Sequence, residues 1–166
     1  MEPVTEHAIR RSFVNCSRGE ATRAHLPDDL DTINGRRWAV MDFLGWVDPK
    51  APQLAYVVVP GDGGLLGVRL RRNGSGGSGR TRMCSVCCTV HPASGVSLMV
   101  AARAGKAGRD GNTVGLDVCS DLRCSGYVHG WAPLPAISRV QETTPVEERA
   151  ARLRRNLDTF LARVLR

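Results

Sequence analysis

Two pairs of closely spaced cysteines constrain the fold of this chain more than any other feature. In the first pair, two residues separate Cys84 from Cys87, and in the second pair, four residues separate Cys119 from Cys124. Structural zinc takes four ligands in a tetrahedron, and cysteine thiolates are common among them. The two pairs therefore predict one zinc ion held by Cys84, Cys87, Cys119 and Cys124.

Clustered cysteines bind a metal ion in preference to forming disulfides only in a compartment where thiols stay reduced. The chain has no apolar run near the ~20 residues that span a membrane, and its first residues lack the apolar core of a signal peptide. We therefore expect a cytoplasmic protein that makes no contact with a membrane. In that compartment clustered cysteines more often bind a metal than form disulfides.

The residues around the two cysteine pairs predict a treble-clef arrangement. Segments 54–59 and 65–70 have strand composition and flank a glycine-rich turn, which is typical of a hairpin. Segments 96–102 and 113–118 are further strand candidates, joined by a loop at 104–112. The first cysteine pair then lies in a knuckle, and the second at a strand-to-helix junction whose helix start favours thiolate. Four thiolates leave no open coordination position, so we expect one structural zinc ion.

Two nearby residues compete for a place in this coordination shell. Cys88 adjoins Cys87, and His91 lies slightly further along the chain. The residue after a knuckle's second sulfur normally turns away, so Cys88 is expected to be a buried, small apolar residue. His91 either caps the strand or replaces a cysteine, and the sequence leaves both possibilities open.

The positive charge of the chain is concentrated in one segment. The net charge is +7, yet residues 63–109 contain eight basic side chains and no acidic one. The rest of the chain carries 15 basic and 16 acidic residues. Such a segment attracts an anionic partner, either a phosphate backbone or an acidic protein surface.

Helices are predicted at both ends of the chain. Thr5 and Ser17 are positioned to cap two short N-terminal helices. Thr144 and Glu147 form the pattern of a capping box with Pro145 at the first helical position. Apolar residues then recur at helical spacing as far as residue 164.

These segments together predict an α+β fold in a single domain over residues 1–166. Residues 1–52 form a helical and turn-rich N-terminal part, because turn dipeptides dominate 27–52. Residues 53–132 hold a small antiparallel sheet with the treble-clef zinc finger. Residues 144–165 form a long C-terminal helix.

The sequence offers little machinery for catalysis. Clustered carboxylates for two-metal chemistry are missing from the basic segment, and the glycines at 61–64 lack the Gly-Lys-Ser/Thr of a phosphate loop. A treble-clef nuclease built on His91 is a possible rival and predicts Mg²⁺-dependent cleavage. It needs an acidic residue beside that histidine, where this chain has Val90. We therefore expect a protein that is not an enzyme, with no catalytic residues and no small-molecule substrate.

Several motifs together resemble a known family. They are residues 42–52 (DFLGWVDPKAP), 83–87 (MCSVC), the pair His91-Pro92, residues 95–100 (GVSLMV) and the Cys119-x4-Cys124 spacing. With these motifs the chain resembles the elongation factor G-binding domain. This is the C-terminal treble-clef zinc-finger domain of FusB-type fusidic acid resistance proteins, here in a short actinobacterial-like form. The resemblance covers nearly the whole chain.

The resemblance implies a binding protein. FusB-type proteins bind elongation factor G and promote its release from the ribosome, including complexes stalled by fusidic acid. The four cysteines would be the zinc ligands, and the partner surface would lie around the knuckle, the 104–112 loop and the helix after Cys124. Two aromatic residues of that helix are four apart, so they are expected to share one face. The expected partner-binding residues are Lys106, Arg109, Tyr127, Trp131, Arg80 and Arg82.

A different class of function competes with this one. A zinc-dependent module that binds RNA or the ribosome would use the basic segment equally well. It predicts affinity for ribosomal RNA alone and a steep dependence on salt. Our expectation is a monomer that binds elongation factor G, with the ribosome and its RNA as further partners.

Overall fold

A five-stranded antiparallel sheet forms the centre of the molecule. The computed structural model describes residues 1–73, 80–138 and 143–166. The strand order is β1-β2-β3-β6-β7. These strands are β1 (Leu44–Val47), β2 (Leu54–Gly61), β3 (Gly64–Arg72), β6 (Val96–Ala102) and β7 (Thr113–Cys119). A separate pair, β4 (Arg82–Met83) and β5 (Val90–His91), forms a small second sheet.

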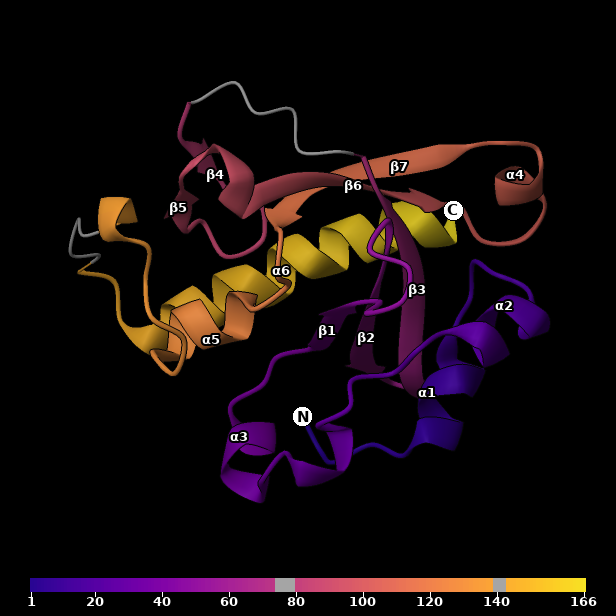
Figure 1. The fold of residues 1–166 in the computed structure, drawn as a ribbon, viewed down its shortest axis with the longest axis horizontal. Coiled ribbons are helices and arrows are strands. Elements are labelled where there is room, and N and C mark those ends of the chain that lie inside the picture. The colour runs from indigo at the N-terminus through magenta and orange to yellow at the C-terminus, as the bar shows by residue number, and fades with distance from the viewer. Residues whose placement is uncertain (74–79, 139–142) are drawn as a thin grey trace.

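Six α-helices surround the sheet in the described residues. They are α1 (Glu6–Ser12), α2 (Arg18–Arg23), α3 (Gly35–Ala39), α4 (Gly105–Arg109), α5 (Cys124–His129) and α6 (Val146–Leu165). Short 3-10 helices lie at Leu30–Thr32, Ala93–Gly95 and Ala136–Ser138. The longest helix, α6, runs along the sheet and reaches α5 at its start, whereas α1 and α2 lie beside β3 and α3 lies below β1 (Figure 1). The α+β class, the antiparallel sheet, the short N-terminal helices and the long C-terminal helix are thus confirmed.

Strand β2 is covered on both faces. Its residues Val57 and Val59 belong to an apolar cluster that includes Leu153 and Phe160 of α6. Its intervening residue Tyr56 belongs to a second cluster, built with the N-terminal segment around Ile9 and Trp38. Because successive side chains of a strand point to opposite faces, this pattern places one core on each side of the sheet.

The predicted hairpin is confirmed at residues 61–64. Gly61 pairs with Gly64 in the register of β2 and β3, leaving a two-residue turn. Gly64 has a φ of +120°, which L side chains rarely adopt, so glycine is required there. The loop between β6 and β7 is also confirmed, and it contains the short helix α4.

Strand β1 was not predicted, because residues 27–52 had the composition of turns. Leu44–Val47 pairs with β2 at the edge of the sheet. The rings of Trp46 and Tyr56 lie opposite each other and stack, with centroids 5.0 Å apart. Cross-strand aromatic packing of this kind stabilises a short strand that its composition does not predict.

The helix caps agree with the sequence at the N-terminus and differ at the C-terminus. Thr5 caps α1, and Ser17 forms a full capping box with Glu20 at α2. The capping box predicted at Thr144 is wrong. Pro145 is the extended N-cap residue of α6, with ψ 150° and no side-chain cap bond. Thr144 therefore lies one residue too early to cap the helix.

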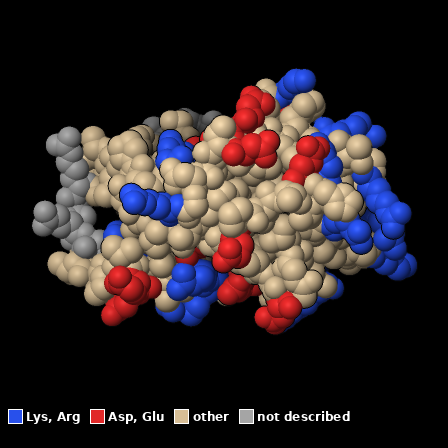
Figure 2. All heavy atoms as spheres, turned by 90° about the horizontal axis from the view of Figure 1, so that it is seen from below, with Lys and Arg blue, Asp and Glu red and all other residues tan. Residues whose placement is uncertain are grey.

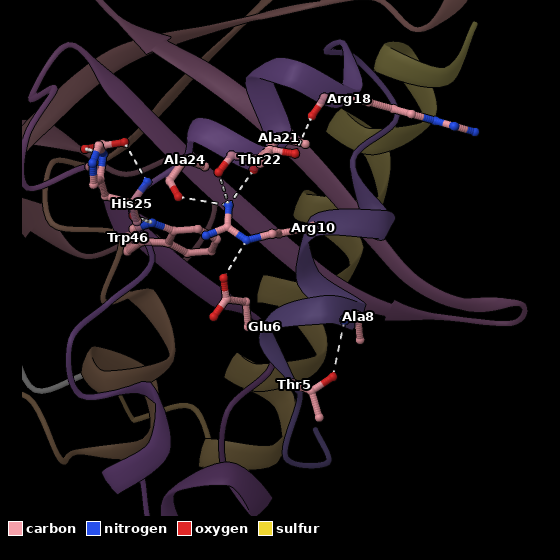
Figure 3. A network of polar contacts seen from close by, with 11 residues as sticks. Thr5, Glu6, Ala8, Arg10, Arg18, Ala21, Thr22, Ala24, His25 and Trp46 are labelled. Atoms are coloured by element: carbon pink, nitrogen blue, oxygen red, sulfur yellow. Dashed lines mark hydrogen bonds and ion pairs between the residues drawn. The ribbon is translucent and has the colours of Figure 1, made fainter.

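Arg10 ties the two N-terminal helices together (Figure 3). Its guanidinium donates to the carbonyl oxygens of Ala21, Thr22 and Ala24 at 2.7, 2.7 and 3.0 Å. These are carbonyls of the last turn of α2, where a cation also complements the helix dipole. None of the helices in the described ranges is long and apolar enough to cross a membrane.

Candidate metal centre

The first cysteine pair lies in a tight knuckle between β4 and β5. The backbone N–H groups of Val86 and Cys87 lie 3.3 and 3.4 Å from the Cys84 sulfur and donate to it. The N–H of Cys88 donates to the Cys84 carbonyl at 2.9 Å, and Cys88 has a φ of 62°. This left-handed residue turns the chain away after Cys87, as predicted from the sequence, but it is half-buried and not buried as expected, because the turn directs it away from the core.

The second pair brackets the turn from β7 into α5. Cys119 is the last residue of β7, and Cys124 is the first residue of α5. Between them Leu122 takes a left-handed φ of 57°. The strand and the helix thus carry one sulfur each to the knuckle, the arrangement that the sequence predicted.

The four sulfur atoms have the spacing of a tetrahedral zinc site. All four ligand atoms lie within 4.8 Å of one another, and all four side chains are buried. The Cys84–Cys124 and Cys87–Cys119 sulfur distances are 3.7 and 3.5 Å. Zinc–thiolate bonds of about 2.3 Å imply sulfur–sulfur distances of about 3.8 Å in a tetrahedron. The cluster therefore fits one structural Zn²⁺, which its four thiolates would hold.

The protonation of these thiols shows why the cluster suits a cation. Hydrogen bonds from Cys119 and Cys124 lower the pKa of Cys84 well below its ordinary value. Hydrogen bonding with Cys119 and Cys84, together with burial, raises the pKa of Cys124 well above it. Four buried thiolates at this separation repel one another, so a divalent cation is needed for all four to ionise together.

His91 lies beside the cluster and not in it. Among the described residues, the group of side chains close enough together to hold a metal ion here consists of the four cysteines. The imidazole is buried, and its Nε2 lies 3.3 Å from the Cys119 sulfur. Burial lowers the pKa of His91, which favours a neutral ring that can donate one N–H to this sulfur. The ring of Tyr127 packs edge-on against it at 5.1 Å.

A model of the family described as "FBP C-terminal treble-clef zinc-finger" matches residues 8–164. The chain belongs to this family. No curated protein and no solved structure matches it. Family and geometry agree on a treble-clef zinc finger with one structural zinc ion.

The 42–52 motif of this FBP-type chain holds the zinc finger against the sheet. The Asp42 carboxylate is buried and lies 3.1 Å from His129 Nε2 and 2.7 Å from Arg154 Nη1. The Asp42 backbone N–H donates to Ser125 Oγ at 3.0 Å. One residue thus joins the start of β1 to both α5 and α6.

Tyr127 and Trp131 do not share a helix face as predicted. Helix α5 ends at His129, and Gly130 follows with a left-handed φ of 76°. Trp131 therefore lies beyond the helix, because a left-handed C-cap redirects the chain. The Tyr127 hydroxyl donates to Asp121 at 2.7 Å, which ties Tyr127 to the loop between Cys119 and Cys124, called the zinc loop below.

The predicted basic residues lie at two separate places. Lys106 and Arg109 are on α4, at the far end of the β6–β7 hairpin from the cysteines. The seven residues of β7 separate these two ends by roughly 20 Å. Arg82 lies near the zinc finger and pairs with Asp117 at 2.6 Å, and Arg80 is exposed. Six candidate residues therefore do not form one continuous surface.

The sequence analysis did not identify two arginines that contact Trp131. The guanidinium carbon of Arg37 lies 4.4 Å from the centre of its ring, and that of Arg123 lies 5.6 Å away. These residues border a hollow of about 450 Å³ that also includes Ile33 and Asp121. Because Arg123 lies between Cys119 and Cys124, the sequence could have placed it beside the zinc site. Nothing in the sequence links Arg37 to the zinc finger.

Proposed function

We propose that this protein is a non-catalytic, zinc-dependent binder of elongation factor G. The observation that carries the proposal is membership of the FBP C-terminal treble-clef zinc-finger family over residues 8–164. The FusB-type proteins that the chain resembles act on the factor by binding it. Release of the factor from the ribosome would follow from this binding, without a chemical step.

The main contact surface in this proposal is the hollow beside the zinc finger. Trp131 offers a large ring, and Arg37 and Arg123 add positive charge beside it. Tryptophan and arginine are the residue types enriched at binding hot spots. An acidic side chain next to an apolar one on the partner would match this combination.

Zinc would control this surface through the loop between Cys119 and Cys124. That loop carries Arg123, which contacts the Trp131 ring. It also carries Asp121, which accepts a hydrogen bond from Tyr127 at 2.7 Å. Metal binding fixes both ends of the loop, so it positions these side chains before the partner arrives and lowers the entropic cost of binding.

A closed four-thiolate shell supports a role without catalysis. It leaves the metal no open position at which to activate a water molecule. The ion would act by stiffening the polypeptide around it. A zinc finger of this kind provides a rigid surface for a partner.

Calorimetric titration into elongation factor G from the same organism tests the proposal. We expect saturable binding near one-to-one for the zinc-loaded protein. For Arg123→Glu we expect a loss of about a hundredfold or more in affinity, because reversal of a charge within an interface costs several kcal/mol. Arg155→Glu is the matched control, since Arg155 is an exposed arginine on α6. Its affinity should stay within about threefold of the wild type.

Two results would count against the proposal. The first is the absence of any complex when bound zinc has been verified in the sample. The second is an equal loss of affinity for Arg123→Glu and Arg155→Glu, which would reflect net charge alone. Cleavage of RNA or DNA that depends on Mg²⁺ and on His91 would instead favour the nuclease.

A further inference from the structure

Basic side chains gather at the end of the molecule opposite the zinc finger. Figure 2 shows Lys and Arg concentrated at its right-hand end, where Figure 1 places α1, α2 and α4. Two adjoining hollows of about 680 and 360 Å³ lie among these helices and share Cys16 and Ser17. Arginines line both of them: Arg10, Arg11 and Arg18 line the larger, and Arg103 and Arg109 the smaller.

The acidic side chains of these helices are already engaged. Each carboxylate of α1, of α2 and of the C-cap of α4 is held by a cation: Glu6 by Arg10 at 2.7 Å, Glu20 by Arg69 at 2.8 Å and Asp110 by Lys106 at 2.6 Å. These pairs cancel the negative charge locally. The remaining arginines therefore make the net charge of this surface positive.

Three arginines are left to face solvent around the hollows. Arg11, Arg18 and Arg109 are exposed, and among the described residues no ion pair or hydrogen bond engages their guanidinium groups. Figure 3 shows the Arg18 side chain extending away from the network that Arg10 makes with the carbonyls of α2. Arg10 is thus structural, whereas these three cations are available to a ligand.

We propose that this end of the molecule binds the phosphate backbone of RNA, with Arg11, Arg18 and Arg109 as its contacts. The planar guanidinium forms paired hydrogen bonds with phosphate oxygens. The exposed ring of His7 borders the larger hollow together with the half-buried ring of Phe13, which also packs against Tyr56, and unpaired bases would stack on the solvent-facing sides of these rings. An acidic protein surface would use the charges but has no need of these rings.

The choice of RNA over DNA rests on the proposed function, which brings the protein to the ribosome. The site itself is separate from the zinc finger, since α4 and the cysteines lie at opposite ends of the β6–β7 hairpin. RNA binding can therefore be measured in the absence of elongation factor G. Failure of RNA binding can then be told apart from failure of binding to elongation factor G.

Fluorescence anisotropy with a short labelled single-stranded RNA tests the inference on the full, zinc-loaded chain. Contacts from three arginines predict a loss of about 20-fold in wild-type affinity between 50 and 200 mM salt. The triple variant Arg11→Ala/Arg18→Ala/Arg109→Ala should lose about two units from the slope of log affinity against log salt. The matched control removes the same charge from exposed arginines elsewhere: Arg36→Ala/Arg71→Ala/Arg155→Ala.

The control variant distinguishes binding at this site from nonspecific electrostatic attraction to the whole protein. If it retains the wild-type slope while the first variant loses it, the inference stands. It is overturned if the wild type binds no RNA saturably at the lower salt, or if both triple variants lose the same affinity. Binding of a poly-glutamate peptide without binding of RNA would overturn it in favour of an acidic protein partner.

Discussion

At the scale of single residues, Asp48 explains part of the 42–52 motif. Its buried carboxylate accepts the backbone N–H groups of His25, Lys50 and Ala51 at 3.1, 2.9 and 3.0 Å. Burial by itself raises the pKa of Asp48, but these three hydrogen bonds outweigh it and lower the pKa below the ordinary value. The Tyr56 hydroxyl also donates to this carboxylate at 3.4 Å. The residue therefore holds the turn after β1 to the segment that follows α2.

We expect Asp48→Asn to destabilise the fold by about 1–3 kcal/mol at pH 7, because it leaves buried donors without a charged acceptor. The pKa of Asp48 is lowered in the folded state, so its contribution is present above the unfolded pKa of about 3.9 and is lost as the pH falls through the folded value. The difference from the wild type should therefore shrink below about pH 4.

Urea unfolding of both proteins across this pH range measures the difference. Asp158→Asn is the control, since Asp158 is exposed on α6 and its replacement should cost under about 0.5 kcal/mol. A difference between Asp48→Asn and wild type that stays constant from pH 7 to pH 3 would contradict the assignment.

At the scale of elements, the zinc loop packs directly on strand β1. A Cβ added at Gly45 would lie 2.7 Å from a ring carbon of Phe43 and 2.9 Å from the Cβ of Leu122. Leu122 belongs to the loop between Cys119 and Cys124 and is buried. The glycine of the motif is therefore required for the close approach of β1 and the zinc loop, not for a turn.

Gly45→Ala should destabilise the protein by about 1–3 kcal/mol, as overpacking of a close contact does. It should also weaken zinc retention against a chelator, because the added methyl group displaces the loop that carries two ligands. Gly35→Ala is the matched control, since a Cβ at Gly35, within α3, meets nothing within 4 Å. Its stability should be equal to or slightly above that of the wild type. Equal zinc retention by both variants would show that β1 does not support the loop.

Elements with a local signal were the ones that the sequence predicted. The Ser17 cap, the turn at Gly64 and the two cysteine pairs each depend on residue types at fixed short spacings. Strand β1 and the contact of Arg37 with Trp131 depend on residues distant in the chain, so no local pattern marks them. At Thr144 a local pattern was present but misleading. The capping-box sequence predicts a helix that begins at Pro145, whereas Pro145 is extended and the helix begins one residue later.

At the scale of the whole molecule, the zinc finger is part of the core. The four cysteines belong to one apolar cluster with Val57 and Met99 of the sheet and Phe160 of α6. Structural zinc contributes about 10–16 kcal/mol in zinc-finger peptides, whereas whole domains are stable by about 5–15 kcal/mol. Loss of the ion should therefore unfold the domain, together with the partner surface that its loop carries.

Elemental analysis of the reduced, tag-free protein, paired with near-UV circular dichroism, tests the zinc finger most directly. We expect about one zinc per chain in the wild type, and loss of both the metal and the tertiary signal in Cys119→Ser. The exposed polar substitution Ser85→Ala, in the knuckle but outside the ligand set, should keep both. A folded wild-type chain without bound zinc, or a Cys119→Ser variant that keeps the metal and the fold, would contradict a structural zinc site.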